Sequence, residues 1–338
     1  MASKVQPGKP TITDVARRAG VSKSLVSLVM RGADHVSPER RQAVNKAAAE
    51  LGYRPNAMAR SLVQRRTHLV GVMVSDLHNP FFADVVAGIQ EQAARTGYKV
   101  LVNSGNRAAA READAMETLL QLRADGIILG SPVLDDEVIG RASREVPIVL
   151  VGREAHGPAV DSVTNDDRAG AEVAVEHCVS LGHRRIAHID GGHGAGAPAR
   201  RHGYEAAMKR LGLGDLVSVV SGTYTEEGGH TGCLLLLAQK PRPTAIFAAN
   251  DLAAIGALNA IEESGLKVPD DVSLVGYDNI YIAELRQLSL TTVDQPRQEM
   301  GRQALELVLE RIEGREERVT RIVEPTLVVR DTAGRVRQ

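Results

Sequence analysis

Short apolar runs alternate with longer amphipathic runs from Leu69 almost to the end of the chain. Apolar runs of this kind, bounded by turn residues, are typical of strands buried in a parallel sheet. The longer runs place apolar residues three and four positions apart, which predicts helices. The predicted strands are 69–74, 99–104, 126–131, 147–152, 185–190, 217–222, 245–250, 272–277 and 326–331, and the predicted helices are 80–97, 113–124, 167–182, 198–212 and 250–265.

These nine strands exceed what one small nucleotide-binding half requires, so we expect an α/β body of two doubly wound lobes. In such sheets ligands bind beyond the carboxyl ends of the strands. Carboxylates, amides and a guanidinium at those ends suit a small polyhydroxylated ligand, whose hydroxyls both donate and accept. Each of these residues could instead cap a helix, and Asp251, which opens a predicted helix, is the clearest case. The residues at the strand ends are Ser75, Asp76, Asn103, Arg153, Asn250, Asp251 and Asp278.

A different pattern occupies the first 62 residues. A first short helix ends at Gly20, which supplies a turn, and Ser22 is placed to cap a second helix. This arrangement predicts a helix-turn-helix whose second helix reads the major groove of DNA, although a plain pair of helices would share the apolar spacing. Val15, Ala19, Val21, Val26 and Val29 would form its small core, while Lys23, Ser24, Ser27 and Leu28 would face outward.

The segment that follows strengthens the DNA-binding interpretation. Ser37, Pro38 and Glu39 provide an N-cap, a first-turn proline and a favourable first-turn charge for a third helix that runs to about Leu51. Residues 53–56 break this helix, and residues 56–63 are too short to form a stable helix alone. They would fold against DNA, with Ala59 and Leu62 on one face and the leucine wedged between base steps, or they would serve as a plain linker.

Charge divides the chain at the same place. Residues 1–66 carry 13 Lys and Arg against 4 Asp and Glu, so the remainder carries 28 against 38. The net charge of −1 is therefore the sum of a positive charge on residues 1–66 and a negative charge on the remainder. The positively charged segment is suited to contacts with phosphates. Basic termini are often solvated tails, which fits residues 1–10 but not the capped, patterned segment after them.

Composition limits the remaining classes. With 338 residues and 43% apolar content, the chain can bury two or three cores. It has no apolar run of the ~18 residues that a membrane span needs and no secretory signal, so we expect a cytoplasmic protein without membrane contact. Cys178 and Cys233 lie far apart and outside any CxxC pair, which predicts reduced, buried thiols and neither a metal site nor a cofactor.

The best enzymatic alternative is a dinucleotide-binding fingerprint. Gly192, Gly194 and Ala197 follow a predicted strand and precede a predicted helix, as in an NAD-dependent oxidoreductase. The next predicted strand, however, does not end in the acid that would bind the ribose, and glycines could equally give a mobile ligand loop. The chain also lacks HExxH and GxSxG motifs. We therefore expect a protein that is not an enzyme.

Several motifs, in this order and spacing, give the chain a resemblance to the LacI/GalR family of bacterial transcription regulators. They are Arg54-Pro55-Asn56, Ala59-Arg60-Ser61-Leu62, Asn79-Pro80-Phe81-Phe82, Gly182-His183-Arg184-Arg185-Ile186, Asn250-Asp251, Gly276-Tyr277-Asp278 and Leu290-Thr291-Thr292-Val293. The resemblance implies a helix-turn-helix headpiece and a two-lobed body like that of periplasmic binding proteins. The implied divisions are an arm (1–10), the headpiece (11–55), a hinge helix and linker (56–66), a first lobe (67–163 with 293–322), a second lobe (164–292 with 323–331) and a tail (332–338).

For the body, the resemblance implies that a small-molecule effector binds between the lobes. A sugar, polyol or glycoside is the leading candidate and a purine the next. Gly152 departs from members with a hydroxyl-binding carboxylate at that position, and the loop 191–196 is unusually rich in glycine. With the strand-end residues, the expected effector site is Ser75, Asp76, Phe81, Phe82, Arg153, Arg200, Tyr224, Asn250 and Asp278.

For the headpiece, the resemblance implies a homodimer on a palindromic double-stranded DNA operator in the bacterial nucleoid, more often repressing than activating. Lys23 and Ser24 hold the family's main base-contacting positions, whereas Leu28 replaces a frequent arginine and offers only apolar contact. The alternatives are a soluble receptor without DNA function and a purely architectural DNA bender. The expected DNA contacts are Thr13, Lys23, Ser24, Ser27, Leu28, Arg31, His35, Ser37, Arg40, Tyr53, Asn56, Ala59 and Leu62.

Overall fold

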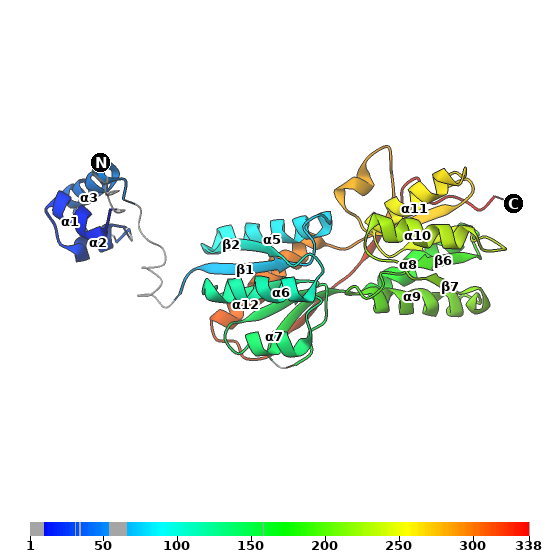
Figure 1. Cartoon of the computed structure of the whole chain (residues 1–338), viewed down its shortest axis with the longest axis horizontal. Helices are drawn as coiled ribbons and strands as arrows, with labels where there is room; N and C mark the ends of the chain where they lie inside the picture. Colours follow the sequence, from blue (N-terminus) through cyan, green and yellow to red (C-terminus); the bar gives the residue numbers. More distant parts are fainter. Residues whose placement is uncertain (1–9, 31, 34, 54–65, 158, 338) are drawn as a thin grey trace, which may run out of the picture. The chain divides into compact units, whose positions relative to one another are not determined.

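A computed structural model describes residues 10–30, 32–33, 35–53, 66–157 and 159–337. The chain divides into two compact units, with the boundary between Thr67 and His68. We call the first unit the headpiece and the second the body, and Figure 1 labels the elements of both. The expected DNA contacts Arg31, Asn56, Ala59 and Leu62, and residues 56–65 of the expected hinge segment, lie outside the described residues.

The headpiece contains three helices, α1 (Ile12–Ala19), α2 (Lys23–Met30) and α3 (Pro38–Leu51). Gly20 and Gly52 end α1 and α3 in the left-handed region, with φ of 66° and 63°, where glycine has no steric cost. The Ser22 hydroxyl oxygen accepts the N–H of Leu25 at 3.2 Å and so caps α2, as predicted. The buried core comprises Val15, Ala16, Val26, Val29, Val36, Val44, Ala47 and Ala48.

The body contains two six-stranded sheets, one in each lobe. The first-lobe sheet has the order β11-β5-β4-β3-β1-β2 and is parallel throughout, whereas in the second-lobe order β12-β10-β9-β8-β6-β7 only β12 runs antiparallel. The first sheet comprises β1 (Leu69–Val74), β2 (Lys99–Ser104), β3 (Gly126–Gly130), β4 (Ile148–Val151), β5 (Val160–Asn165) and β11 (Thr320–Val323). The second comprises β6 (Ile186–Ile189), β7 (Ser218–Val220), β8 (Ala245–Ala248), β9 (Ser273–Asp278), β10 (Thr291–Asp294) and β12 (Thr326–Val328).

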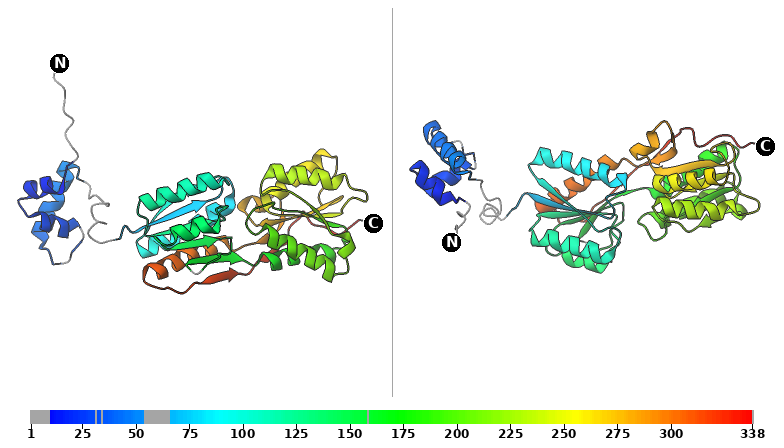
Figure 2. Two further views of the ribbon diagram at one scale, coloured as in Figure 1. Left: turned by 60° about the horizontal axis from the view of Figure 1, so that its bottom comes forward. Right: turned by 45° about the horizontal axis from the view of Figure 1, so that its top comes forward.

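Helices cover both faces of each sheet, as the two views of Figure 2 show. In the first lobe, α5 (Pro80–Thr96) and α12 (Arg297–Ile312) pack on one face, and α6 (Ala109–Gln121) and α7 (Asp136–Ala142) on the other. In the second lobe, α10 (Glu226–Leu237) and α11 (Asp251–Glu263) oppose α8 (Asp167–Ser180) and α9 (Ala197–Arg210). Alternate residues of each strand enter opposite cores, which explains why the strands are apolar almost throughout. The predicted doubly wound, two-lobed fold is confirmed.

Three strands of the described body, β5, β10 and β11, escaped the sequence prediction. β5 reads Val-Asp-Ser-Val-Thr-Asn and is too polar to be recognised as a buried strand. Its fully buried Asp161 accepts hydrogen bonds from Arg311 and Arg315 at 2.6–3.0 Å, and this pairing offsets the cost of burying the carboxylate. The partners lie 150 or more positions away, so no local pattern could reveal the strand.

The chain crosses between the lobes three times, from β5 to α8, from β10 to α12 and from β11 to β12. These crossings place the carboxyl ends of both sheets on the two sides of one cleft. Beyond β12 the chain still packs on the second lobe, because the Thr332 hydroxyl donates to the carbonyl of Leu274 at 2.8 Å. Part of the segment that we expected to form a tail is therefore attached to the body.

Candidate functional site

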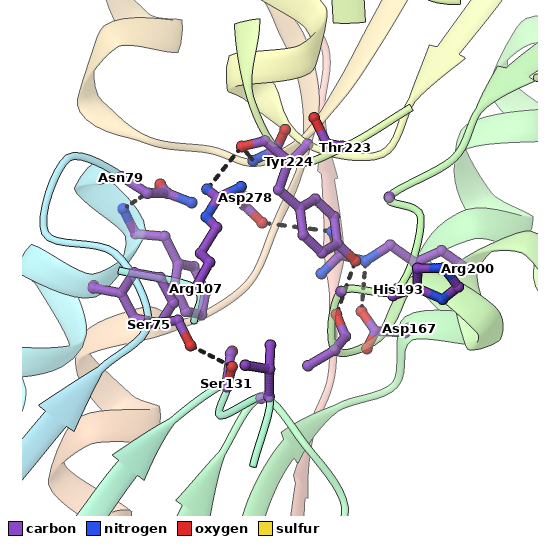
Figure 3. A pocket seen from close by; sticks show the side chains of 18 of the residues that line it. Ser75, Asn79, Arg107, Ser131, Asp167, His193, Arg200, Thr223, Tyr224 and Asp278 are labelled. Atoms are coloured by element: carbon purple, nitrogen blue, oxygen red, sulfur yellow. Dashed lines mark hydrogen bonds and ion pairs between the residues drawn. The ribbon is translucent and has the colours of Figure 1, made fainter. Parts of the chain in front are cut away.

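A cavity of about 320 Å³ lies between the two lobes, at the carboxyl ends of the strands. Its size falls at the lower end of the range that small-molecule sites occupy. Figure 3 shows residues of both lobes pointing into it. The lining comprises Ser75, Asn79, Phe81, Phe82, Arg107, Ser131, Val133 and Gly152 from the first lobe, and Asp167, Gly191, His193, Gly194, Ala195, Arg200, Thr223, Tyr224, Asn250, Asp278 and Gln295 from the second lobe and its crossover.

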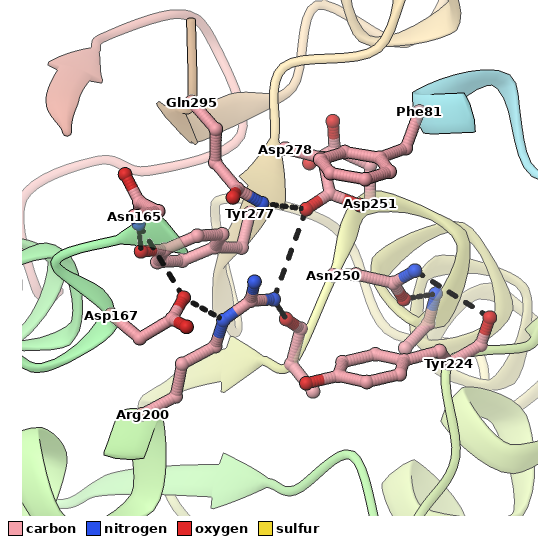
Figure 4. Close-up of polar contacts among 12 residues, drawn as sticks. Phe81, Asn165, Asp167, Arg200, Tyr224, Asn250, Asp251, Tyr277, Asp278 and Gln295 are labelled. Atoms are coloured by element: carbon pink, nitrogen blue, oxygen red, sulfur yellow. Dashed lines mark hydrogen bonds and ion pairs between the residues drawn. The ribbon is translucent and has the colours of Figure 1, made fainter. Parts of the chain in front are cut away.

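Arg200, on the first turns of α9, is the buried cation of the cavity and is only 6% exposed. Its Nε donates to Asp167 at 2.8 Å, and its Nη1 donates to the carbonyl of Ala249 and lies 3.8 Å from the Asp278 carboxylate. The guanidinium also stacks on the ring of Tyr277, 3.7 Å from its centre, as Figure 4 shows. These contacts fix the orientation of the guanidinium, so a ligand meets a rigid donor.

Asp278 ends β9 with φ of 111°, a conformation that non-glycine residues rarely adopt. Its carboxylate accepts the amide of Gln295 at 2.6 Å, and its carbonyl accepts the guanidinium of Arg297. Burial raises the pKa of Asp278 to about 6, although Arg200 and Arg297 act in the opposite direction. Gln295 and Arg297, which lie where the chain crosses from β10 to α12, therefore hold the carboxylate and the strained backbone of Asp278 in place.

Asn250 caps α11, because its side-chain oxygen accepts the N–H of Ala253 at 2.9 Å, while its amide lines the cavity. The neighbouring Asp251 is not the cap. Its buried carboxylate accepts the Thr292 hydroxyl and the Ile280 N–H at 2.5 and 2.8 Å, and so joins α11 to β10 and to the loop after β9. Burial, together with Asp278, raises the pKa of Asp251 to about 8.

Arg107 reaches from the first lobe to the second. Its Nη2 lies 2.9 Å from the Asp76 carboxylate and donates to the carbonyl of Tyr224 at 3.0 Å. Arg107 and the preceding Asn106 both have positive φ, 55° and 49°, so the turn after β2 is strained in order to present this side chain. Nothing in the local sequence distinguishes Arg107 from other surface arginines, and sequence reasoning missed it.

A buried glutamate organises the first-lobe wall behind the cavity. The Ser75 hydroxyl contacts the Glu112 carboxylate at 3.0 Å, and the other Glu112 oxygen accepts the N–H groups of Val133 and Leu134 at 2.7 and 3.2 Å. Burial raises the pKa of Glu112, although these hydrogen bonds act to lower it. The contacts fix the loop after β3, which carries Ser131 and Val133 into the cavity. Gly152 faces the same loop, with φ of 75°.

The structure brings together most of the residues expected to bind the effector. Ser75, Phe81, Phe82, Arg200, Tyr224, Asn250 and Asp278 all line the cavity, whereas Asp76, Arg153 and Asn103 do not. Asp76 does not line the cavity itself but pairs with Arg107, which does. Arg153 instead donates to Asp136 and to the carbonyls of Pro132 and Leu134, behind the loop after β3. Whether the lining residues contact a ligand stays a prediction.

In the headpiece, Lys23 and Ser24 are exposed on the first turn of α2, where a recognition helix presents its base-reading side chains. His35, Ser37 and Arg40 are also exposed, and Thr13 and Tyr53 are half-buried. Ser27 and Leu28 are half-buried, and the side chain of Leu28 packs partly against the headpiece core. Whether Leu28 contacts a thymine methyl stays a prediction.

Comparison with known proteins gives both units the same assignment. Residues 11–56 match the family model of bacterial regulatory proteins of the lacI family, and residues 67–329 match the model of periplasmic binding proteins and the sugar-binding domain of the LacI family. The chain belongs to the LacI family of bacterial transcription regulators. The resemblance inferred from sequence motifs is thus confirmed, and so is the DNA-binding, effector-binding architecture.

Relatives match this LacI-family chain over nearly its full length. It is 34% identical to the ribose operon repressor of Haemophilus influenzae over 95% of this chain and 98% of that protein. Its structure is similar to the lac repressor dimer bound to operator and an anti-inducer, with a TM-score of 0.84 and 30% identity over 96% and 99% of the chains. A regulator CelR–cellobiose complex is 35% identical over 96% and 100%, with a TM-score of 0.72.

Two absences hold for the described parts of this LacI-family regulator. No helix among them is both long and apolar enough to cross a membrane. Within the same residues, no cluster of three or more histidine, cysteine or acidic side chains could hold a metal ion.

Proposed function

We propose that the protein is a repressor that binds a palindromic operator as a homodimer and responds to an uncharged, polyhydroxylated effector in the cleft. The observation that carries the effector class is the charge balance of the cavity. Its two arginines are both paired, Arg107 with Asp76 at 2.9 Å and Arg200 with Asp167 at 2.8 Å. A phosphorylated or carboxylated ligand would need an unpaired cation to balance its charge. The hydroxyls of a neutral ligand need no such cation, because they can form hydrogen bonds to charged side chains that are already paired with each other.

Two of the similar proteins support this choice. The curated relative from Haemophilus influenzae is a ribose operon repressor, and the CelR structure contains cellobiose. A sugar, polyol or glycoside therefore remains the leading effector candidate for this chain. The aromatic residues Phe81, Phe82 and Tyr224 in the lining would contact the carbon-bound hydrogens of such a ligand.

We further propose that the protein has no enzymatic activity and acts in the bacterial cytoplasm, on the nucleoid. The enzymatic alternative placed a dinucleotide at the start of α9. A side-chain carbon at Gly196, the N-cap of α9, would lie 2.5 Å from a carboxylate oxygen of Asp167. The Asp167 side chain therefore lies directly against this helix end, in the space that a bound pyrophosphate would need.

The DNA function is tested by selecting duplexes from a random library with the full-length protein and with a variant that begins at Thr67. We expect the full-length protein alone to enrich a near-palindrome with a flexible pyrimidine–purine step at its centre. The selection is repeated with neutral sugars and glycosides in case an effector is needed for binding. If no condition enriches a sequence, the protein is instead a soluble receptor.

The effector class is tested separately by thermal shift, because a ligand that binds only the native state raises the melting temperature. The panel pairs each neutral sugar with its phosphate, for example ribose with ribose 5-phosphate. We expect stabilisation by neutral members only. Stabilisation by the phosphate and not by its neutral partner would refute the charge-balance argument while leaving the DNA function intact.

A further inference from the structure

The glycine-rich loop 191–196 connects β6 to α9 and forms part of the second-lobe wall of the cavity. Sequence reasoning offered two explanations for its glycines, a phosphate-binding turn and a mobile ligand loop. The structure gives a different one. Figure 3 shows the ring of Tyr224 lying against this loop, above His193 and Arg200.

Two of the glycines leave space that the Tyr224 ring occupies. A side-chain carbon at Gly191 would lie 2.5 Å from Cζ of Tyr224, and one at Gly194 would lie 2.2 Å from its Cε2. Both distances are far below van der Waals contact, so an alanine at either position would displace the ring. Neither glycine has a positive φ, which means that the steric contact, and not the backbone conformation, is what requires glycine there.

The same loop holds the end of the Tyr224 side chain. The tyrosine hydroxyl donates to the carbonyl of Ala195 at 2.8 Å. Burial raises the pKa of this hydroxyl, so it keeps its proton and can act as the donor. The hydroxyl hydrogen of Tyr224 is therefore bonded to the loop, and the tyrosine presents the face and edge of its aromatic ring to the cavity.

A buried carboxylate joins the glycine-rich loop to the segment that carries Tyr224. Asp190, which is 8% exposed, accepts the N–H groups of Gly192 and Gly222 at 3.0 and 3.1 Å. A side-chain carbon at Gly192 would lie 2.9 Å from the carbonyl oxygen of Gly222, so these two segments are also in close contact. The loop and the segment that carries Tyr224 are thus held together by hydrogen bonds and close packing.

We propose that Gly191 and Gly194 are positioning residues that set the orientation of Tyr224 in the cavity wall. Their lack of a side chain provides the surface on which the ring lies, and Ala195 holds the hydroxyl. Through Tyr224 they determine the shape that the second lobe offers to a ligand. The assignment of the cavity as an effector site rests on the function proposed above, whereas the positioning of the ring does not.

A double-mutant cycle on the ligand-free, full-length protein tests the proposal. Gly194→Ala is made alone and together with Tyr224→Ala, and the melting temperature of the body is measured by calorimetry. Overpacking by one methyl group should lower it by about 4 °C or more when Tyr224 is present. In the Tyr224→Ala background the same substitution should lower it by less than about 2 °C, because the ring is then absent and only the carbonyl oxygen of Gly191 remains close, at 3.2 Å.

Gly140→Ala is the matched control. Gly140 also has a negative φ, and a side-chain carbon there would meet no atom within 4 Å. It should leave the melting temperature unchanged or slightly raised in both backgrounds. An equal loss from Gly194→Ala with and without Tyr224, or no loss in either, would overturn the proposal.

A spectroscopic measurement separates positioning from general destabilisation. The chain has six tyrosines, so labelling with [ζ-13C]tyrosine gives few signals, and Tyr224→Phe identifies the one from Tyr224. We expect Gly194→Ala to shift that signal and leave the others in place, and Gly140→Ala to shift none. A Tyr224 signal unchanged by Gly194→Ala would also overturn the proposal. Neither experiment involves DNA or an effector, so a failure here leaves the proposed function standing.

Discussion

Replacing Arg200 by methionine tests whether the body depends on the buried charge at the centre of the cleft. The substitution keeps most of the aliphatic volume but removes the cation that lies 2.8 Å from Asp167 and 3.8 Å from Asp278. Removing one partner of a buried ion pair costs about 3–5 kcal/mol, because a charge stays buried without compensation. Each kcal/mol lowers the melting temperature of a domain of 150–250 residues by about 2–4 °C, so we expect a fall of about 6–20 °C, or slightly less in the larger body.

The pH dependence supplies a second test of the same reasoning. Burial raises the folded-state pKa of Asp278 to about 6, so stability associated with this group falls as pH rises through 6. Without the guanidinium the pKa must rise further, and the carboxylate can then escape its unpaired charge by taking up a proton. The deficit of the Arg200→Met variant should therefore be smaller at pH 5 than at pH 8.

Calorimetry of the full-length proteins at both pH values provides the assay. Arg141→Met is the matched control, because Arg141 is exposed and pairs with the exposed Glu137 at 2.7 Å on the surface. Exposed pairs contribute about 0–1 kcal/mol, so its body transition should move by less than ~4 °C. An Arg200→Met variant that melts within about 2 °C of the parent, or with the same deficit at pH 5 and pH 8, would refute the argument.

Three further predictions concern the reader helix, the contact between the lobes and the thiols. Lys23→Ala should relax base preference at one half-site position, with about 1–3 kcal/mol lost against the preferred base, and an unchanged selected sequence would remove Lys23 from the reader. Arg107→Met breaks the hydrogen bond between the lobes and should change the effect of the effector on operator affinity, measured as a ratio of Kd values, whereas Arg111→Met should not. Burial raises the pKa of both Cys178 and Cys233 to about 12, so neither should react with a thiol reagent at pH 8 until the body unfolds, and fast labelling of native protein would contradict this.

Local patterns were sufficient for much of the architecture. The nine predicted strands are all present, because each is a short apolar run that both faces of a covered sheet require. The headpiece helices begin and end close to the predicted residues, since Ser22, Pro38 and the glycines at 20 and 52 act within one turn. The charge division between head and body likewise needed only counting.

The cavity could be predicted only in part. Residues that directly follow strands, such as Asn250 and Asp278, were found because parallel topology brings those ends together. Asp167, His193 and Gln295 gave no such signal, and Arg153 gave a misleading one, since it follows a strand yet turns away to Asp136. The strand β5 was missed for a related reason, because the arginines that neutralise Asp161 come from the far end of the chain.

The sequence alone therefore determined the fold class, the family and most of the strands, because strand burial, helix caps and motif spacing are properties of neighbouring residues. Only the tertiary structure decided which polar groups are paired, and pairing is what gives them their chemistry. Arg107 became a contact between the lobes through Tyr224, 117 positions away. The glycines at 191 and 194, which looked like a flexible or phosphate-binding turn, became the surface for an aromatic ring once the fold placed Tyr224 against them. Such contacts depend on distances across the fold, which no local pattern encodes.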